Sequence, residues 1–243
     1  MQEHGREAPG RSRAALAPLV GAALGAALAA AVLPRWLPGL TASLLGPEPK
    51  AYWYLSRASG LVAFVLVWAS VSMGLLITSR VSRVWPGGPT AFDLHQFLGL
   101  LGLGMAAFHA LVLLGDPYLG YTLLGLLVPG AGAAYRPVWV AMGQAGLYLG
   151  LVVALSFYVR RRIGPRTWRL LHYGSFAVYA LVLAHGLAAG TDVAAPAVLA
   201  LYWLTGGVTY FLLVYRLLVS VREPRHPPGE GHGERHAGHG AVG

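Results

Sequence analysis

The sequence contains no cysteine and very little charge. Only 11% of its 243 residues are Asp, Glu, Lys or Arg, against about 25% in an ordinary soluble domain. Without cysteine the chain forms no disulfides, thiolate zinc sites or iron–sulfur clusters, and it has no cysteine nucleophile. So few charges cannot cover the surface of a soluble globule, which excludes a soluble enzyme domain and most nucleic-acid-binding domains. Any cofactor must be held by His, Asp, Glu, Tyr, Met or backbone atoms.

Long apolar runs take the place of charge. Hydrophobic residues make up 56% of the chain, and a bilayer-spanning helix needs about 20 mostly apolar residues. These runs are too long for strands and lack period-two alternation. Six runs qualify: 14–33, 53–78, 92–114, 137–158, 167–189 and 194–219. The sequence therefore predicts an all-α integral membrane protein, a six-helix transmembrane bundle.

The chain divides into three parts on this interpretation. Residues 1–50 hold an N-terminal cytoplasmic segment, the first transmembrane helix and an external loop. The first run also fits a signal peptide or an uncleaved signal anchor, since it is rich in alanine and follows three arginines. Residues 51–220 form the main helical domain, and residues 221–243 form a His-rich cytoplasmic tail that we expect to be disordered.

The net charge of +9 is explained by topology. Basic residues concentrate in the cytoplasmic loops of membrane proteins. Of the 18 basic residues, 14 fall in alternate links and ends on one side of the predicted spans, whereas Arg35, Lys50, Arg57 and Arg136 fall on the other. The pattern predicts a multi-pass protein of the cell membrane with both termini in the cytoplasm. Its partner is the lipid bilayer, and no nucleic acid is expected.

Four of the nine histidines lie inside predicted spans. His95 and His109 are on the third span, and His172 and His185 are on the fifth. Both spans cross in the same direction, and 1.5 Å of rise per residue places the members of each pair about 20 Å apart. His95 therefore shares a depth with His172, and His109 with His185. Two histidines at one depth on facing helices are the ligand set of a low-spin b-type haem, so two levels predict two haems.

The rotational positions of the histidines around their helices agree less well with two shared haems than their depths do. Fourteen residues return His109 to nearly the face of His95, whereas thirteen leave His172 and His185 about 140° apart on an ideal helix. A tilted fifth helix or a short 3₁₀ segment would narrow this angle, and a lipid-facing His185 would exclude the outer haem. Glycines near the histidines either admit a flat macrocycle or pack helices: Gly99, Gly102, Gly104, Gly174 and Gly186.

Three motifs carry a resemblance to a known family. They are Trp-Tyr-Leu-Ser-Arg-Ala-Ser-Gly at 53–60, Asp-Leu-His-Gln-Phe-Leu-Gly at 93–99 with His109, and Trp-Arg-Leu-Leu-His at 168–172 with His185. Over about residues 50–220 the chain resembles the ferric reductase-like transmembrane domain. That family includes the membrane halves of ferric reductases and NADPH oxidases and the haem-binding membrane subunit of a periplasmic methionine sulfoxide reductase.

The resemblance implies a cytochrome b of electron transport, either a ferric reductase-like oxidoreductase or an electron-transfer subunit of one. It implies that His95, His109, His172 and His185 bind the iron of haem b, and we expect Arg57 to bind a haem propionate. The cytoplasmic donor would be a flavin reductase, a quinol or reduced flavin, because no Gly-rich dinucleotide motif follows the last span. The external acceptor would be ferric iron or a periplasmic reductase.

Two alternatives stay open at this stage. One is an electron-transfer subunit with a single haem and a flavin; FMN is a candidate because the sulfoxide reductase subunit of the family binds flavin. The other is a haem-free transporter or structural membrane protein whose histidines relay protons or pack helices. That second alternative predicts histidines at scattered depths, usually together with acidic residues inside the membrane.

Overall fold

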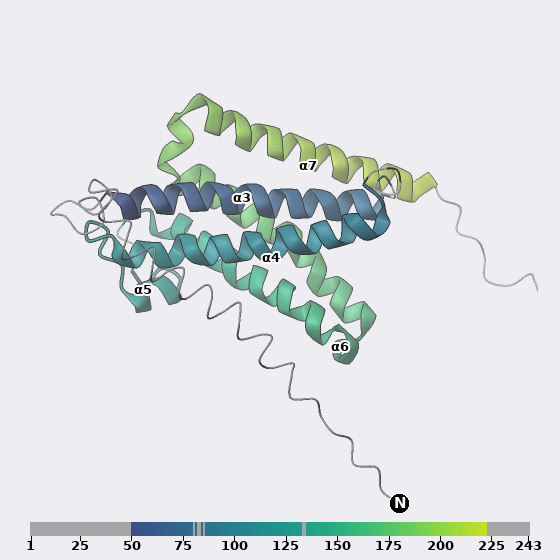
Figure 1. Ribbon diagram of the computed structural model, residues 1–243, viewed down its shortest axis with the longest axis horizontal. Coiled ribbons are helices and arrows are strands. Elements are labelled where there is room, and N and C mark those ends of the chain that lie inside the picture. Colours follow the sequence, from purple (N-terminus) through teal and green to yellow (C-terminus); the bar gives the residue numbers. More distant parts are fainter. Residues whose placement is uncertain (1–49, 80, 82–83, 85, 133–134, 223–243) are drawn as a thin grey trace, which may run out of the picture.

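The computed structural model describes residues 50–79, 81, 84, 86–132 and 135–222, and this part of the chain contains helices and no strands (Figure 1). The predicted first span and the His-rich tail lie outside the described residues. The elements are α3 (Ala51–Thr78), α4 (Gly88–Val112), η2 (Leu113–Gly115), α5 (Leu123–Leu127), α6 (Pro137–Ala189), η3 (Thr191–Ala194) and α7 (Pro196–Arg222). The predicted all-α class is confirmed for these residues.

Four of these helices, α3, α4, α6 and α7, are long and apolar enough to cross a membrane. The 53 residues of α6 would extend about 80 Å if straight, far beyond the roughly 30 Å hydrocarbon core. Gly164 breaks this helix with φ 80° and ψ 159°, a conformation open essentially only to glycine. The predicted fourth and fifth spans are therefore two arms of α6, residues 137–163 and 165–189.

Contacts across α6 show that its arms are antiparallel. Gly146 faces Val182 and Gly150 faces Val178, and each pair is equidistant in sequence from Gly164. The chain thus reverses direction at Gly164, and Pro165 immediately after it lacks the N–H that a continuous helix would use. We call residues 137–163 the first arm and residues 165–189 the second arm.

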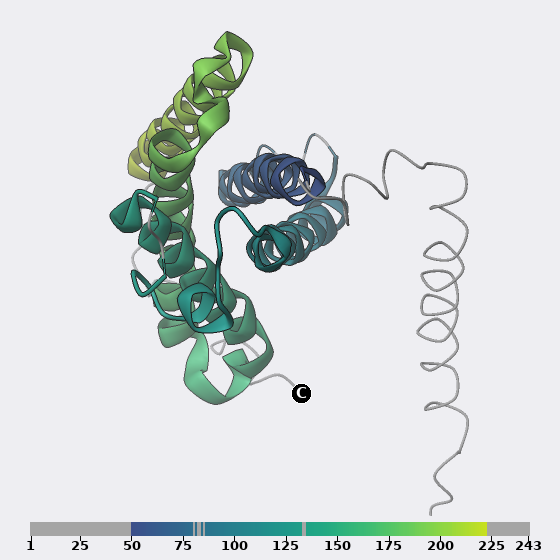
Figure 2. The ribbon, with the colours of Figure 1, turned by 90° about the vertical axis from the view of Figure 1, so that its left-hand side faces the viewer.

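The long helices lie along one direction (Figure 1). The end of α3, the start of α4, the turn between the arms and the end of α7 all lie at one end of the bundle (Figure 1). These are the links that the charge pattern assigns to one side of the membrane. Seen end-on, the arms of α6 and α7 form an arc, and α3 and α4 lie on its inner side (Figure 2).

A small aromatic core joins α3, the second arm and α7. The Phe64 ring lies 4.7 Å from the Tyr202 ring and 6.1 Å from the Tyr179 ring, between ring centres. Val71 and Leu75 complete this buried cluster. Large apolar side chains elsewhere point outward and are exposed, including Trp203, Leu204, Tyr210 and Phe211 on α7. Such an outward apolar face suits a lipid environment rather than water.

The link between α4 and α6 is hydrogen-bonded to the first arm. The Thr122 hydroxyl accepts a hydrogen bond from the Gly125 N–H and caps α5. The Gln144 amide on the first arm donates to the carbonyl oxygens of Gly125 at 2.9 Å and Leu126 at 2.8 Å. These bonds satisfy carbonyls at the end of a short helix that has too few residues to do so itself.

Candidate functional site

The four histidines predicted from the spans come together in two pairs. The ring centres of His95 and His172 are 5.9 Å apart with an interplanar angle of 77°, and those of His109 and His185 are 6.2 Å apart at 72°. All four side chains are half-buried. These are the pairs expected from depth; the role of the residues as haem ligands stays a prediction.

The separation within each pair is that of two imidazoles sharing one metal ion. A metal–imidazole bond of about 2.0 Å, with roughly 1.15 Å from nitrogen to ring centre, places two opposed rings about 6.3 Å apart. Among the described residues no three His, Asp or Glu side chains converge on a common point. A zinc-type site needs three or four protein ligands. Two histidines suffice only where another molecule supplies the remaining ligands, as the four nitrogens of a porphyrin do.

Helix α3 orients the two histidines of α4. The ring N–H at Nδ1 of His95 donates to the Ser70 carbonyl oxygen at 2.8 Å, and that of His109 donates to the Ser56 carbonyl oxygen at 2.8 Å. Because a carbonyl only accepts, Nδ1 carries the proton and Nε2 keeps its lone pair. Metal-binding histidines almost always use their second nitrogen in this way.

A glycine four residues after each serine makes room for the ring. A Cβ at Gly60 would lie 2.8 Å from His109 Nδ1, and a Cβ at Gly74 would lie 3.3 Å from His95 Cε1. We call this arrangement, an accepting carbonyl with a glycine one turn later, a cradle. Ser56 and Gly60 form one cradle, and Ser70 and Gly74 form another 14 residues further along α3.

The first arm of α6 supplies a third cradle, for His185. The N–H at Nδ1 of His185 donates to the Trp139 carbonyl oxygen at 2.8 Å. A Cβ at Gly143, four residues later, would lie 2.8 Å from that Nδ1 atom. The same carbonyl-and-glycine device therefore recurs on a different helix, at the same depth as the Ser56 cradle.

His172 differs from the other three histidines in its surroundings. Its ring stacks on Trp168, one turn earlier on the same arm, with ring centres 5.2 Å apart and an interplanar angle of 24°. Within the described part of the chain, the other three histidines each have a hydrogen bond to a backbone carbonyl, and the ring nitrogens of His172 have none. The two members of the inner pair are therefore held by different interactions.

The second arm contains no 3₁₀ segment, because Gly164 is the only non-helical residue within α6. The 13-residue spacing therefore leaves His172 and His185 about 140° apart around the helix axis, as on an ideal helix. His185 lies in the seam between the two arms, one turn after Val182 and facing Gly143. His172, 13 residues earlier, points out of that seam, and both rings still reach their partners on α4.

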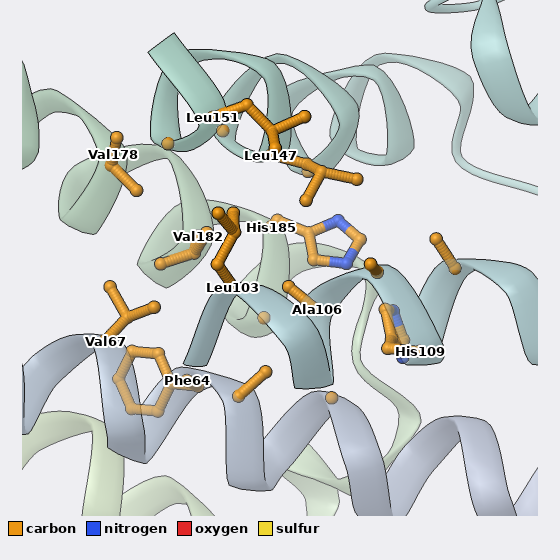
Figure 3. Close-up of a pocket in the computed structure, with 18 of the residues that line it drawn as sticks. Phe64, Val67, Leu103, Ala106, His109, Leu147, Leu151, Val178, Val182 and His185 are labelled. Carbon is orange, nitrogen blue, oxygen red and sulfur yellow. The ribbon is translucent and has the colours of Figure 1, made fainter. Parts of the chain in front are cut away.

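One cavity of about 1320 Å³ contacts all four histidines. Its volume exceeds the roughly 300–1000 Å³ of ordinary ligand pockets. Phe64, Leu103 and Val182 line it near His109 and His185, whose rings point into the same space (Figure 3). The cavity is thus mainly apolar and contacts both imidazole pairs.

Arg57 also lines this cavity, as its predicted role requires. Its guanidinium is already paired with Asp192 of η3, however, with Nε donating to a carboxylate oxygen at 2.7 Å and a second bond through Nη2. Arg169 and Arg216 line the other end of the cavity, and neither forms an ion pair within the described residues. Binding of a propionate by Arg57 stays a prediction.

The glycines singled out in the sequence are not the ones that accommodate the histidines. Gly102 packs against Val67 of α3, and Gly174 packs against Val153 across the arms. These two glycines pack helices, whereas Gly99 and Gly186 line the cavity and a Cβ at Gly104 would meet no atom of the described residues within 4 Å beyond its own helix. The cradle glycines were missed, although a signal exists: Ser-x₃-Gly occurs twice on α3 at the 14-residue spacing of the α4 histidines.

The fold and the site together define a class of protein: a helical protein with helices apolar enough to span a membrane and two imidazole pairs at two levels of one apolar cavity. Comparison of the chain with family models, with curated proteins and with solved structures finds no match to any of them. Inference about function therefore rests on the geometry and on the motifs.

Proposed function

We propose that the protein is a six-helix transmembrane b-type cytochrome that moves electrons from a cytoplasmic donor through two bis-histidine haems to an external acceptor. The separation of the paired imidazole rings, 5.9 and 6.2 Å, is the observation that carries this proposal. The resemblance to the ferric reductase-like transmembrane domain supports it. When bound, haem iron supplies one-electron redox chemistry that no side chain of this chain provides.

The residues of the chain fit two haems at two depths. His95 and His172 would hold the inner one, and His109 and His185 the outer one. Along α4 the two levels are 14 residues apart, about 21 Å. The cradles fix the tautomer and the ring orientation of three ligands before any cofactor arrives. The apolar cavity wall would limit access of water and lower the local dielectric, which sets the reduction potential of a bound haem.

Two haems account for the geometry better than one haem and a flavin. The inner and outer pairs have nearly the same ring separation and nearly the same interplanar angle. A site built for one haem would leave the second pair without a function. The location of a flavin such as FMN, if one binds, is not defined by any motif of this chain.

A haem-free proton relay is less consistent with the site. Such a relay needs exchangeable protons and neighbouring acids inside the membrane. Within the described residues, three of the histidines donate to backbone carbonyls. Asp192 is paired with Arg57, and Asp116 accepts from the backbone N–H of Tyr118, so no carboxylate of this part of the chain contacts the histidine pairs.

The two ends of the cavity suggest the direction of flow. Arg169 and Arg216, which the charge pattern assigns to the cytoplasmic side, line the cavity together with His172, so a flavin reductase, a quinol or reduced flavin would donate there. The end near Arg57 and Asp192 would face the external acceptor, either ferric iron or a periplasmic reductase partner.

A haem count on the purified full-length protein tests the proposal. We expect sharp reduced-minus-oxidised bands of bis-histidine haem and two haems per chain. The double variants H95A/H172A and H109A/H185A should each retain one haem. A variant with His226, His232, His236 and His239 all changed to Ala is the matched control and should retain two. Absence of haem in the wild type, or a haem count unchanged by either double variant, would contradict the proposal.

A further inference from the structure

The inner imidazole pair is asymmetric in how its two rings are held. His95 sits in a cradle formed by the Ser70 carbonyl and Gly74. The Ser70 hydroxyl also donates back to the His95 carbonyl at 3.1 Å. His172 is held instead by stacking on the Trp168 ring. In the outer pair both rings donate to carbonyls, those of Ser56 and Trp139.

The spacing of the histidines produces this asymmetry. His95 and His109 are 14 residues apart on α4, so they lie about 40° apart around the helix axis, on the face toward α3. Both rings therefore reach an α3 carbonyl. A 13-residue spacing on the second arm leaves only His185 in the seam against the first arm. His172 is rotated about 140° away from that seam, and no carbonyl of the described helices accepts its Nδ1 hydrogen.

From these contacts we infer that His172 is the exchangeable ligand of the inner haem, and that the inner level alone admits an exogenous small ligand at iron. The inference rests on the proposed function, since it concerns the haems that the histidine pairs would hold. A hydrogen bond from Nδ1 to a carbonyl makes the imidazole a stronger donor and holds its ring in place. His172 lacks this hydrogen bond and is held only by stacking on Trp168, so its bond to iron would be the weakest of the four.

In the ligand exchange, the bond between Nε2 of His172 and iron would break and the neutral imidazole would move aside. The lone pair of a neutral diatomic ligand would take its place, with no transfer of electrons or protons. The Trp168 indole resists this movement, because aromatic stacking contributes about 0.5–1.5 kcal/mol beyond the area it buries.

Carbon monoxide is the probe, added to the dithionite-reduced full-length protein in detergent. We expect one CO bound for every two haems in the wild type. H109A/H185A, which keeps the inner level, should bind one CO per haem, whereas H95A/H172A, which keeps the outer level, should bind none.

Trp168 variants supply the second readout, the rate of CO binding at the inner level. W168L removes the stacking and should accelerate binding roughly 2- to 12-fold, the factor that corresponds to the stacking free energy. W168F keeps an aromatic ring and should bind CO at close to the wild-type rate. G143A is the reciprocal variant: its new Cβ displaces the His185 ring, so its outer level should become CO-reactive.

Several results would overturn the inference while leaving the cytochrome proposal intact. One is a wild-type protein with two haems that binds no CO. Another is CO reactivity that persists in H95A/H172A and disappears in H109A/H185A. Equal rates in W168L and W168F would remove the role of Trp168. A protein without haem would instead refute the proposed function itself, so the two failures are distinguishable.

Discussion

Replacement of Gly60 or Gly143 by alanine should weaken haem binding at the outer level, and replacement of Gly74 should not do so at the inner level. The sharpest case is G60A. The added methyl would lie 2.8 Å from Nδ1 of His109 and 3.0 Å from its Cε1, so the ring must move away from the Ser56 carbonyl. Gly143 presents the same situation to His185. At Gly74 the nearest His95 atom is 3.3 Å away, and a small shift of the ring relieves the contact.

The magnitude follows from two effects on haem binding. Overpacking of the ligand ring costs about 1–3 kcal/mol, and the lost hydrogen bond costs about 1 kcal/mol. The higher helix propensity of alanine acts on folding equally with and without haem, so it does not enter the binding free energy. G60A and G143A should therefore weaken outer-level haem binding by about 2–4 kcal/mol, or about 25- to 700-fold. G74A should stay within about 1 kcal/mol of the wild type, because a small shift of the His95 ring relieves the contact and keeps the hydrogen bond.

Gly104 provides the matched control. It lies on α4 between His95 and His109 and is exposed, and a methyl group added there would meet no atom of the described residues within 4 Å beyond its own helix. G104A should keep both haems and the wild-type temperature of haem loss, or raise that temperature slightly. The assay is haem per protein after purification, together with the midpoint temperature of haem loss. Equal haem retention in G60A and G104A would refute the cradle interpretation.

The ion pair, the turn and the unequal ligand sets each give a further prediction. D192N should raise the reduction potential of the outer haem in a redox titration by tens of millivolts, on the order expected for the newly unpaired Arg57 charge. The free energy of unfolding should change by less than about 1 kcal/mol, since the ion pair is about one-third exposed. G164A should lower the thermal midpoint, because φ 80° and ψ 159° cost a non-glycine residue about 1–3 kcal/mol, whereas P165A should have the smaller effect. H109A/H185A keeps only the inner haem and H95A/H172A keeps only the outer haem, and a redox titration should give the inner haem the higher reduction potential. Equal reduction potentials in the two variants would contradict this prediction.

Much of the fold could be predicted from the sequence because membrane spans obey strong constraints. The apolar runs that became α3, α4, the arms of α6 and α7 were found from length and hydropathy alone. The depth pairing of the histidines needed only the helical rise and the direction of each span. The reversal between the fourth and fifth spans was predicted to lie within 159–166, but not that Gly164 makes it, because that depends on the backbone conformation.

The surroundings of the histidines could not be predicted in the same way. Depth depends on one coordinate, whereas a cradle depends on which face of one helix meets which face of another. The groups of Ser56 and Ser70 that accept these hydrogen bonds are backbone carbonyls. Every residue has a backbone carbonyl, so the residue type does not identify the acceptor. Arg57 illustrates the same limit. Its position at the cavity was predicted, but its pairing with Asp192, 135 residues later, depends on the tertiary fold.

The unequal spacing of the histidines has a consequence for electron flow on the proposed function. The inner level has one carbonyl-bonded imidazole and two nearby arginines, Arg169 and Arg216, that form no ion pair among the described residues. Both features favour the reduced iron, so an electron that moves outward goes uphill in free energy.

A membrane potential that is negative inside drives the electron outward, by about 2.3 kcal/mol per 100 mV across the full bilayer. The two levels span about 21 Å of roughly 30 Å, so about 1.6 kcal/mol per 100 mV acts between them and offsets the climb. The membrane potential would therefore accelerate outward electron transfer, and the rate in vesicles should fall when an ionophore collapses the potential.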